Sequence, residues 1–180
     1  MFLSSLTLGN FQNNVLFISA KTGDWSLDAI DRKIIRAVET DARISYSELA
    51  ERVSLSKTPC WNRVKALEES GVIRGYVARL DAARLGLSLE AMIHVTIDLA
   101  LSDAFETAVR NNPLILRCLA TTGDADYILH VVATDMPGLD RLLRGDLCRL
   151  PGIRRFVTSM ITREVKADGS VSAAAESLRL

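Results

Sequence analysis

Two short amphipathic segments between residues 45 and 67 constrain this chain most, because only about four residues separate them. The first is expected to begin after Ser45, since Ser45 and Glu48 have the spacing of a capping box and an apolar stripe follows them. The second carries Thr58 followed by Pro59, an N-cap hydroxyl with proline at the first helical position. Two helices joined by so short a connection form a helix-turn-helix.

The second of these helices has two distinct faces. At about 100° per residue, Cys60, Val64 and Leu67 fall within about 60° of one another and form the core side. The opposite face is short, polar and basic, and such side chains bond phosphates and base edges in a major groove. An ordinary solvated helix of a small α domain would carry a similar pattern. The candidate DNA-contacting residues are Ser56, Lys57, Thr58, Pro59, Trp61, Asn62, Arg63 and Lys65.

The flanking sequence favours a winged helix-turn-helix over residues 25–80. A helix is predicted upstream, from an N-cap at Ser26 to Asp41, because apolar residues recur there with the helical period. Gly71 is expected to end the second helix, and the loosely alternating residues 72–80 predict a small hairpin, the wing. From Arg52 to Arg79 there are six Lys or Arg residues and two acidic ones, although the whole chain has a net charge of zero. The positive charge therefore lies on the elements expected to face DNA.

From residue 89 onward the apolar pattern alternates, which predicts a second domain after a linker at residues 81–88. Apolar residues at every second position from Leu89 to Leu99 indicate a strand with one face in a core. Further strands are predicted over residues 114–121, 127–134 and 156–166, with helices from Ser102 and from about Pro137. The order βαββαβ predicts a ferredoxin-like domain over residues 89–166, which makes the chain α+β. The sheet face away from the helices is also apolar, so a homodimer is expected to cover it.

Composition limits the remaining function classes. A chain of 180 residues holds one large or two small domains. Its three cysteines and two histidines lack metal-ligand spacing, so neither a metal site nor a cofactor is expected. No run approaches the ~20 apolar residues of a membrane span, so no membrane partner is predicted. A cytoplasmic location is predicted instead. Residues 1–24 are expected to be an extension outside the fold, and residues 167–180 a polar tail without a site.

Several motifs, taken together from Leu27 to Lys166, resemble those of the feast/famine (Lrp/AsnC) family of transcription regulators. The first half carries Leu55-Ser56-Lys57-Thr58-Pro59-Cys60 and Gly71-Val72-Ile73-Arg74-Gly75-Tyr76, and the second half carries Gly123-Asp124-Ala125-Asp126-Tyr127, Leu150-Pro151-Gly152-Ile153 and Glu164-Val165-Lys166. The resemblance implies a regulator that binds double-stranded DNA as dimers, often assembled into tetramers or octamers, and that senses an amino acid. Lys57 and Trp61 depart from the usual residues of the family, which bears on DNA preference more than on fold.

The resemblance also implies an effector site at the turn around Asp124 and at the end of the last strand. Two carboxylates there are suited to the ammonium group of an amino acid, although Gly-Asp-Ala-Asp is also ordinary turn chemistry. Without an activated nucleophile, a metal set or a phosphate loop, an enzyme is not expected. The alternative is an architectural DNA-binding protein of the same fold without a ligand response. The implied effector-binding residues are Gly123, Asp124, Asp126, Tyr127, Met160, Ile161 and Thr162.

Overall fold

The computed structural model describes residues 27–178, which form two compact units. The helix-turn-helix unit contains residues 27–76 together with residues 170–178, and the sheet unit contains Val77–Gly169. Both ends of the described chain therefore belong to the same unit. The extension predicted at residues 1–24 lies outside the described residues. The N-cap predicted at Ser26 was wrong, because Asp28, two residues later, caps the first helix. No helix within residues 27–178 has the length and apolar content needed to cross a membrane.

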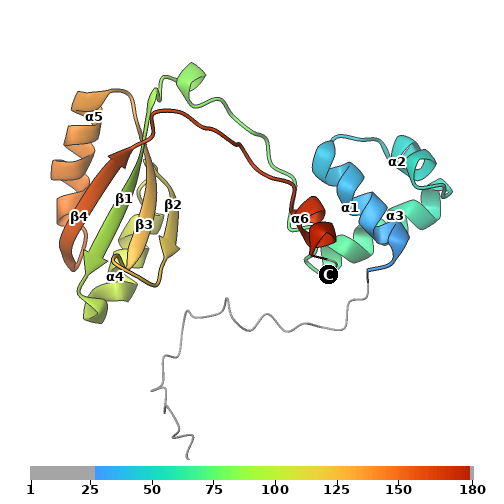
Figure 1. The fold of residues 1–180 in the computed structure, drawn as a ribbon, viewed down its shortest axis with the longest axis horizontal. Helices are drawn as coiled ribbons and strands as arrows, with labels where there is room; N and C mark the ends of the chain where they lie inside the picture. Colours follow the sequence, from blue (N-terminus) through green and yellow to red (C-terminus); the bar gives the residue numbers. More distant parts are fainter. Residues whose placement is uncertain (1–26, 179–180) are drawn as a thin grey trace, which may run out of the picture. The chain divides into compact units, whose positions relative to one another are not determined.

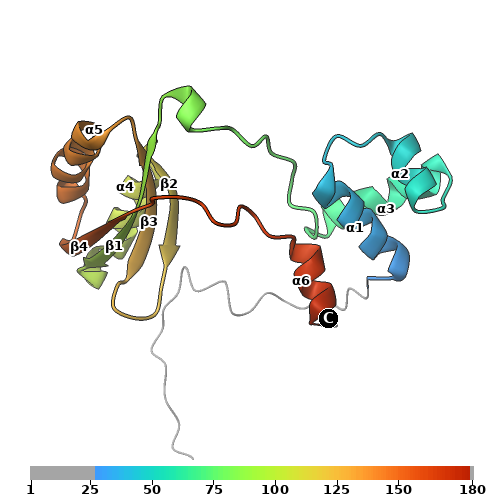
Figure 2. The same ribbon diagram turned by 45° about the horizontal axis from the view of Figure 1, so that its top comes forward.

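The regular secondary structure of the helix-turn-helix unit is entirely helical in the described residues (Figure 2). α1 (Ala29–Thr40), α2 (Tyr46–Arg52) and α3 (Lys57–Glu69) pack around one apolar core, and α6 (Val171–Ser177) lies beside α1. Ser45 caps α2 as predicted, since its side chain accepts a hydrogen bond from the Glu48 backbone N–H. The buried residues of this core are Ile34, Val38, Leu49, Ala50, Val53, Cys60, Val64 and Leu67.

The start of α3 differs from the prediction. Ser56 is the N-cap, so the helix begins at Lys57, and Thr58 and Pro59 are its second and third residues. Proline fits there because the first four N–H groups of a helix have no partner within it. The predicted cap at Thr58 was therefore wrong by two residues, and Lys57 stands on the first turn of the helix.

The predicted wing does not form in the described chain. Residues 74–81 contain neither strand nor helix. Gly75 has a φ of +148°, a conformation that side-chain-bearing residues rarely adopt. Val77 and Leu80 are 88% and 75% exposed, so the alternating apolar residues have no surface to pack on. The hairpin prediction was wrong, because alternating apolar and polar residues form a strand only where a second segment lies beside them to pair with.

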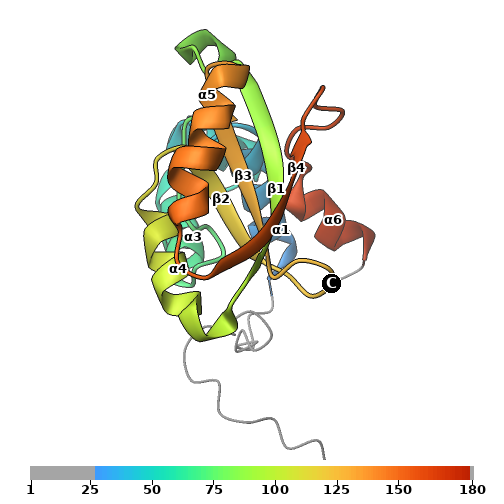
Figure 3. The same ribbon diagram turned by 90° about the vertical axis from the view of Figure 1, so that its left-hand side faces the viewer.

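The sheet unit has the predicted ferredoxin-like order. Its elements are β1 (Leu89–Ile97), α4 (Ser102–Arg110), β2 (Ile115–Ala120), β3 (Tyr127–Ala133), α5 (Met136–Arg141) and β4 (Ile153–Met160). The strand order is β2-β3-β1-β4 and every neighbouring pair is antiparallel. Both helices cover the same face of the sheet, and in Figure 3 they lie in front of it. Between the two layers the core is built on buried residues such as Ile93, Val95, Phe105, Leu129 and Leu142.

The helix predicted from about Pro137 forms nearly as expected, whereas the last strand of the sheet ends earlier than predicted. α5 is capped by Asp135, and beyond Arg141 it continues as a π-helical and then a 3₁₀ turn up to Arg149. β4 ends at Met160, six residues before the predicted end, because its partner β1 begins at Leu89. The last backbone bond of this edge runs from the Ile161 N–H to the Glu90 carbonyl.

One face of the sheet has no helix over it in the described chain, and we call it the outer sheet face. Successive side chains of a strand point to opposite faces. Ile93 and Val95 are fully buried under the helices, so Met92 and His94, which alternate with them, point to the outer sheet face. Val157 lies opposite His94 and remains 46% exposed. The outer sheet face carries Glu90, Met92, His94, Thr96, Arg117, Leu119, Ile128, His130, Arg155, Val157 and Ser159.

Candidate DNA-contacting helix and ligand-binding turn

The exposed side of α3 presents polar and basic side chains over its first turns. Cys60, Val64 and Leu67 are buried on the opposite side, where they hold the helix against its neighbours. Trp61 is 43% exposed, and the Lys65 ammonium lies 5.3 Å from the centroid of its ring, which is a cation–π contact. All but one of the predicted DNA-contacting residues are exposed, namely Ser56, Lys57, Thr58, Pro59, Trp61, Asn62 and Lys65.

Arg63 is the exception, because it is engaged inside the unit. Its Nη1 atom lies 2.6 Å from Asp28 Oδ2 and 2.7 Å from Asp31 Oδ1. These two aspartates form the capping box at the start of α1, so one cluster joins that turn to the middle of α3. Hydrogen bonds from the Asp31 backbone and from Arg63 hold the pKa of Asp28 below its usual range. Arg63 therefore has a structural role in joining α1 to α3.

We expect Arg63→Ala to lower the melting temperature of the protein, whereas Lys57→Ala leaves it nearly unchanged. The first substitution removes the cation that two carboxylates share, and the second trims an exposed side chain. Thermal unfolding followed by circular dichroism measures both. The deficit of Arg63→Ala should shrink at high salt, because screening weakens the wild-type ion pairs. Equal melting temperatures for the two variants would remove the structural role of Arg63.

The turn between β2 and β3 is held by its own hydrogen bonds. The Thr121 hydroxyl donates to the Ala125 carbonyl at 2.6 Å. Asp126 Oδ2 accepts from the Ile97 N–H at 2.9 Å, just beyond the last β1–β3 pair at Val95. The Asp126 side chain thus takes the place of a backbone acceptor at the end of the ladder. Gly123, with φ +145°, and Asp124 remain exposed at the tip of the turn.

Tyr127 belongs to the core between sheet and helices. It is buried, its hydroxyl donates to Glu106 Oε1 at 3.0 Å, and its ring centroid lies 4.8 Å from that of Phe105. Burial, followed by the hydrogen bond with Glu106, raises the pKa of Tyr127 to about 12. The partnership with Glu106 of α4 has no sequence signal, because the two residues are 21 positions apart and lie on different elements.

The two halves of the implied effector site lie at opposite ends of the sheet within one chain (Figure 1). Tyr127 pairs with Val95, whereas Met160 pairs with Ala91, four residues away along β1. At ~3.3 Å per residue this separates them by about 13 Å along the strand, and they also lie on opposite sides of it. Met160, Ile161 and Thr162 are exposed. One small ligand therefore cannot contact both groups in a single chain.

Comparison with known proteins covers both units. A winged helix-turn-helix DNA-binding family matches residues 27–74, and the Lrp/AsnC ligand binding domain matches residues 90–171. The leucine-responsive regulatory protein of Escherichia coli K12 is 40% identical over 151 residues, covering 82% of this chain and 92% of the relative. The Bkd operon transcriptional regulator of Pseudomonas aeruginosa is 37% identical over 142 residues, covering 77% and 93%.

Solved structures agree with these relatives. A transcriptional regulator of Neisseria meningitidis in complex with L-Met superimposes with a TM-score of 0.79 at 34% identity, covering 85% of this chain and 99% of that one. An AsnC family regulator from Agrobacterium tumefaciens gives a TM-score of 0.74 at 28% identity, with 80% and 95% covered. These proteins are transcription regulators, which agrees with the prediction that the chain is not an enzyme.

Proposed function

Because the chain belongs to the Lrp/AsnC family of DNA-binding transcription regulators, we propose that it reads DNA in the cytoplasm as a homodimer through α3 and adjusts this binding to an amino acid. The observation that carries the proposal is the exposed first half of α3. There Thr58 and Asn62 share the side opposite the buried core residues, and Lys57 stands exposed on the first turn. A lysine, a hydroxyl and an amide at the start of one helix are suited to phosphates and base edges of a major groove.

The dimer is proposed from the outer sheet face. Val157 and Leu119 are 46% and 43% exposed on this face. Ile128 and His94 lie between them in the same cross-strand row, and Met92 lies next to His94 along β1. A second copy related by a two-fold axis would cover the apolar side chains of both subunits. It would also bring two α3 helices to one DNA, as readers of two half-sites require. Tetramers or octamers would follow from further contacts between dimers.

The amino-acid site is proposed to need two chains. Asp124 and Asp126 stand at one end of the sheet, and Met160, Ile161 and Thr162 stand at the other. In a tetramer or octamer, the turn of one subunit would supply the carboxylates for the ammonium group. The exposed end of β4 in a neighbouring subunit would supply the apolar contacts and the Thr162 hydroxyl. Binding would then couple directly to assembly, with a typical coupling of ~1–3 kcal/mol.

Calorimetry with the twenty amino acids tests the sensor. We expect one or a few with medium-sized apolar side chains, such as L-methionine or L-leucine, to bind, and Asp124→Asn or Asp126→Asn to weaken that binding about ten- to a hundredfold. Asparagine is chosen over alanine at position 126 because its side-chain oxygen still accepts from the Ile97 N–H. The variant therefore removes the charge and keeps the fold of the turn.

The architectural alternative makes a different prediction for the same titration. In that case Asp126 and Tyr127 would serve only to hold the fold through their intrachain hydrogen bonds, and the turn would bind no ligand. No amino acid would bind below millimolar concentration or change DNA affinity, while DNA binding through α3 would be intact. If Asp124→Asn and Asp126→Asn both bind the amino acid as tightly as the wild type, the amino acid binds at a site other than this turn.

A further inference from the structure

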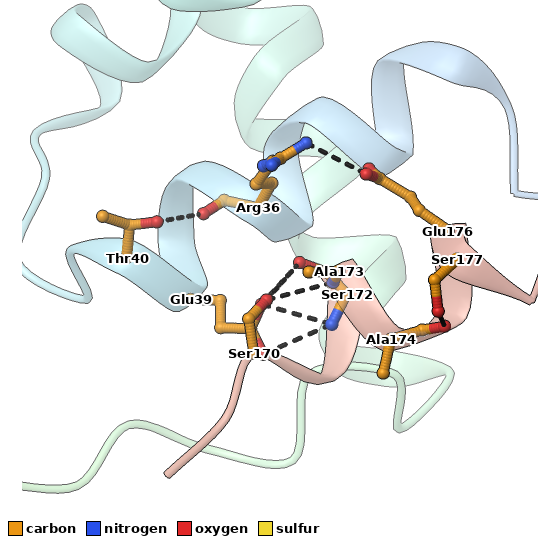
Figure 4. Close-up of polar contacts among 9 residues, drawn as sticks. All are labelled: Arg36, Glu39, Thr40, Ser170, Ser172, Ala173, Ala174, Glu176 and Ser177. Atoms are coloured by element: carbon orange, nitrogen blue, oxygen red, sulfur yellow. Dashed lines mark hydrogen bonds and ion pairs between the residues drawn. The ribbon is translucent and has the colours of Figure 1, made fainter. Parts of the chain in front are cut away.

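One carboxylate of α1 holds the N-terminal end of helix α6. Glu39 near the end of α1 accepts hydrogen bonds from the Ser170 hydroxyl at 2.7 Å and from both the N–H and the hydroxyl of Ser172 (Figure 4). It also accepts from the Val171 N–H at 2.6 Å. One turn earlier on α1, Arg36 forms an ion pair with Glu176 at 3.0 Å. The contact therefore runs along most of α6.

This contact is what makes α6 a helix. A seven-residue helix is too short to be stable alone in water, and no residue of α6 is buried. Its first N–H groups are instead satisfied by Glu39 and by the Ser170 hydroxyl, which accepts from the Ala173 N–H at 3.0 Å. Burial alone would raise the pKa of Glu39, but hydrogen bonds from Ser172 and Ser170 outweigh it and lower that pKa. Glu39 is thus a charged acceptor at neutral pH.

The docked helix gives the chain a second connection between its units. The first connection leaves the helix-turn-helix unit after Tyr76, and the second returns to it at Ser170. The returning segment begins where β4 ends, at Met160, and is joined to the outgoing segment by an ion pair between Asp168 and Arg79. Only residues 163–170 separate Thr162, the last of the proposed effector contacts, from α6.

We propose that α6 is a releasable clamp, anchored by Glu39, that carries changes at the end of β4 to the helix-turn-helix unit. The coupling part of this inference rests on the proposed function, whereas the docking part does not. The anchor is polar and exposed to solvent, which competes for its hydrogen bonds, so it is weak enough to open. A negative charge placed on Ser170 or Ser172 would face the Glu39 carboxylate and release α6 by repulsion.

Hydrogen exchange of the full chain tests the clamp. We expect Glu39→Ala and Ser172→Asp to speed exchange of residues 171–178 by about tenfold, the effect of losing roughly one hydrogen bond to a charged group. Ser177→Ala is the matched control, because the Ser177 hydroxyl bonds only within α6, to the Ala174 carbonyl. Rates that are the same in all three variants and the wild type would overturn the clamp. Equal acceleration by Ser177→Ala would do so as well.

DNA binding then tests the coupling, with each of the twenty amino acids added separately. Unliganded Glu39→Ala should bind operator DNA within about twofold of the wild type but lose most of the response to the amino acid, since the bound amino acid would no longer act on α1 through a docked α6. A full response in Glu39→Ala would overturn the coupling. If the wild type responds to none of the twenty, the sensor proposal fails, and small-angle scattering then tests the clamp alone. In that case Glu39→Ala must broaden the size distribution of the protein for the second connection to stand.

Discussion

Replacing Val157 by Lys is expected to convert the proposed dimer into monomers without unfolding the chain. Val157 is 46% exposed in the single subunit, so a charge there costs the isolated fold little. In the dimer the same side chain would be buried, next to His94 and on the face that carries Arg155. A buried charge without a partner costs about 3–5 kcal/mol, so the dimer dissociation constant should rise by a hundredfold or more.

Light scattering at micromolar concentration measures this change, and circular dichroism establishes that the variant is folded. Leu99→Lys is the matched control, because Leu99 is 61% exposed in the turn after β1 and lies outside the outer sheet face. A Val157→Lys variant that keeps the wild-type mass would show that the outer sheet face is not the interface. Loss of assembly in both variants would point to general destabilisation instead.

Alternation predicted the sheet where neighbouring strands exist and failed where they do not. Residues 89–97 alternate because every second side chain enters the core under α4 and α5, and that burial imprints a period of two. Residues 72–80 and 161–166 were also predicted as strand, yet they form none. β4 stops because its partner β1 begins at Leu89, and in the described chain no strand lies beside residues 72–80. A β-strand forms only where a second segment lies beside it and accepts its hydrogen bonds. The residue pattern of one segment does not say whether such a neighbour exists.

The candidate DNA-contacting residues were predictable from the sequence only where their exposure depends on which side of the helix they occupy. The exposure of Thr58, Asn62 and Lys65 follows from the buried positions of α3, which the sequence spacing identified. The engagement of Arg63 does not follow, because its partners lie 32 and 35 residues away in the chain. The same holds for Glu39 and Ser170, which are 131 residues apart and meet only in the folded unit.

Lys57→Ala and Asn62→Ala are expected to weaken DNA binding in two distinguishable ways. Lys57 is an exposed cation on the first turn of α3, so its loss should weaken binding to all sequences alike and lower the salt slope by about one. Asn62 offers an amide that suits a base edge, and its loss should cost about 1–3 kcal/mol at one base position. Titration of selected and scrambled DNA over a salt series separates the two effects.

These substitutions isolate α3 because neither residue takes part in the Asp28–Asp31–Arg63 cluster or in the buried core. Lys166→Ala serves as the control for loss of one positive charge, since Lys166 is an exposed lysine of the sheet unit. It should leave both affinity and salt slope nearly unchanged. Arg63→Ala, in contrast, should lose affinity together with thermal stability, and its deficit should not depend on DNA sequence. If Lys57→Ala and Asn62→Ala both bind selected DNA as tightly as the wild type at moderate salt, α3 is not the reading helix, and the positive charge of residues 52–79 must act through other elements of that unit.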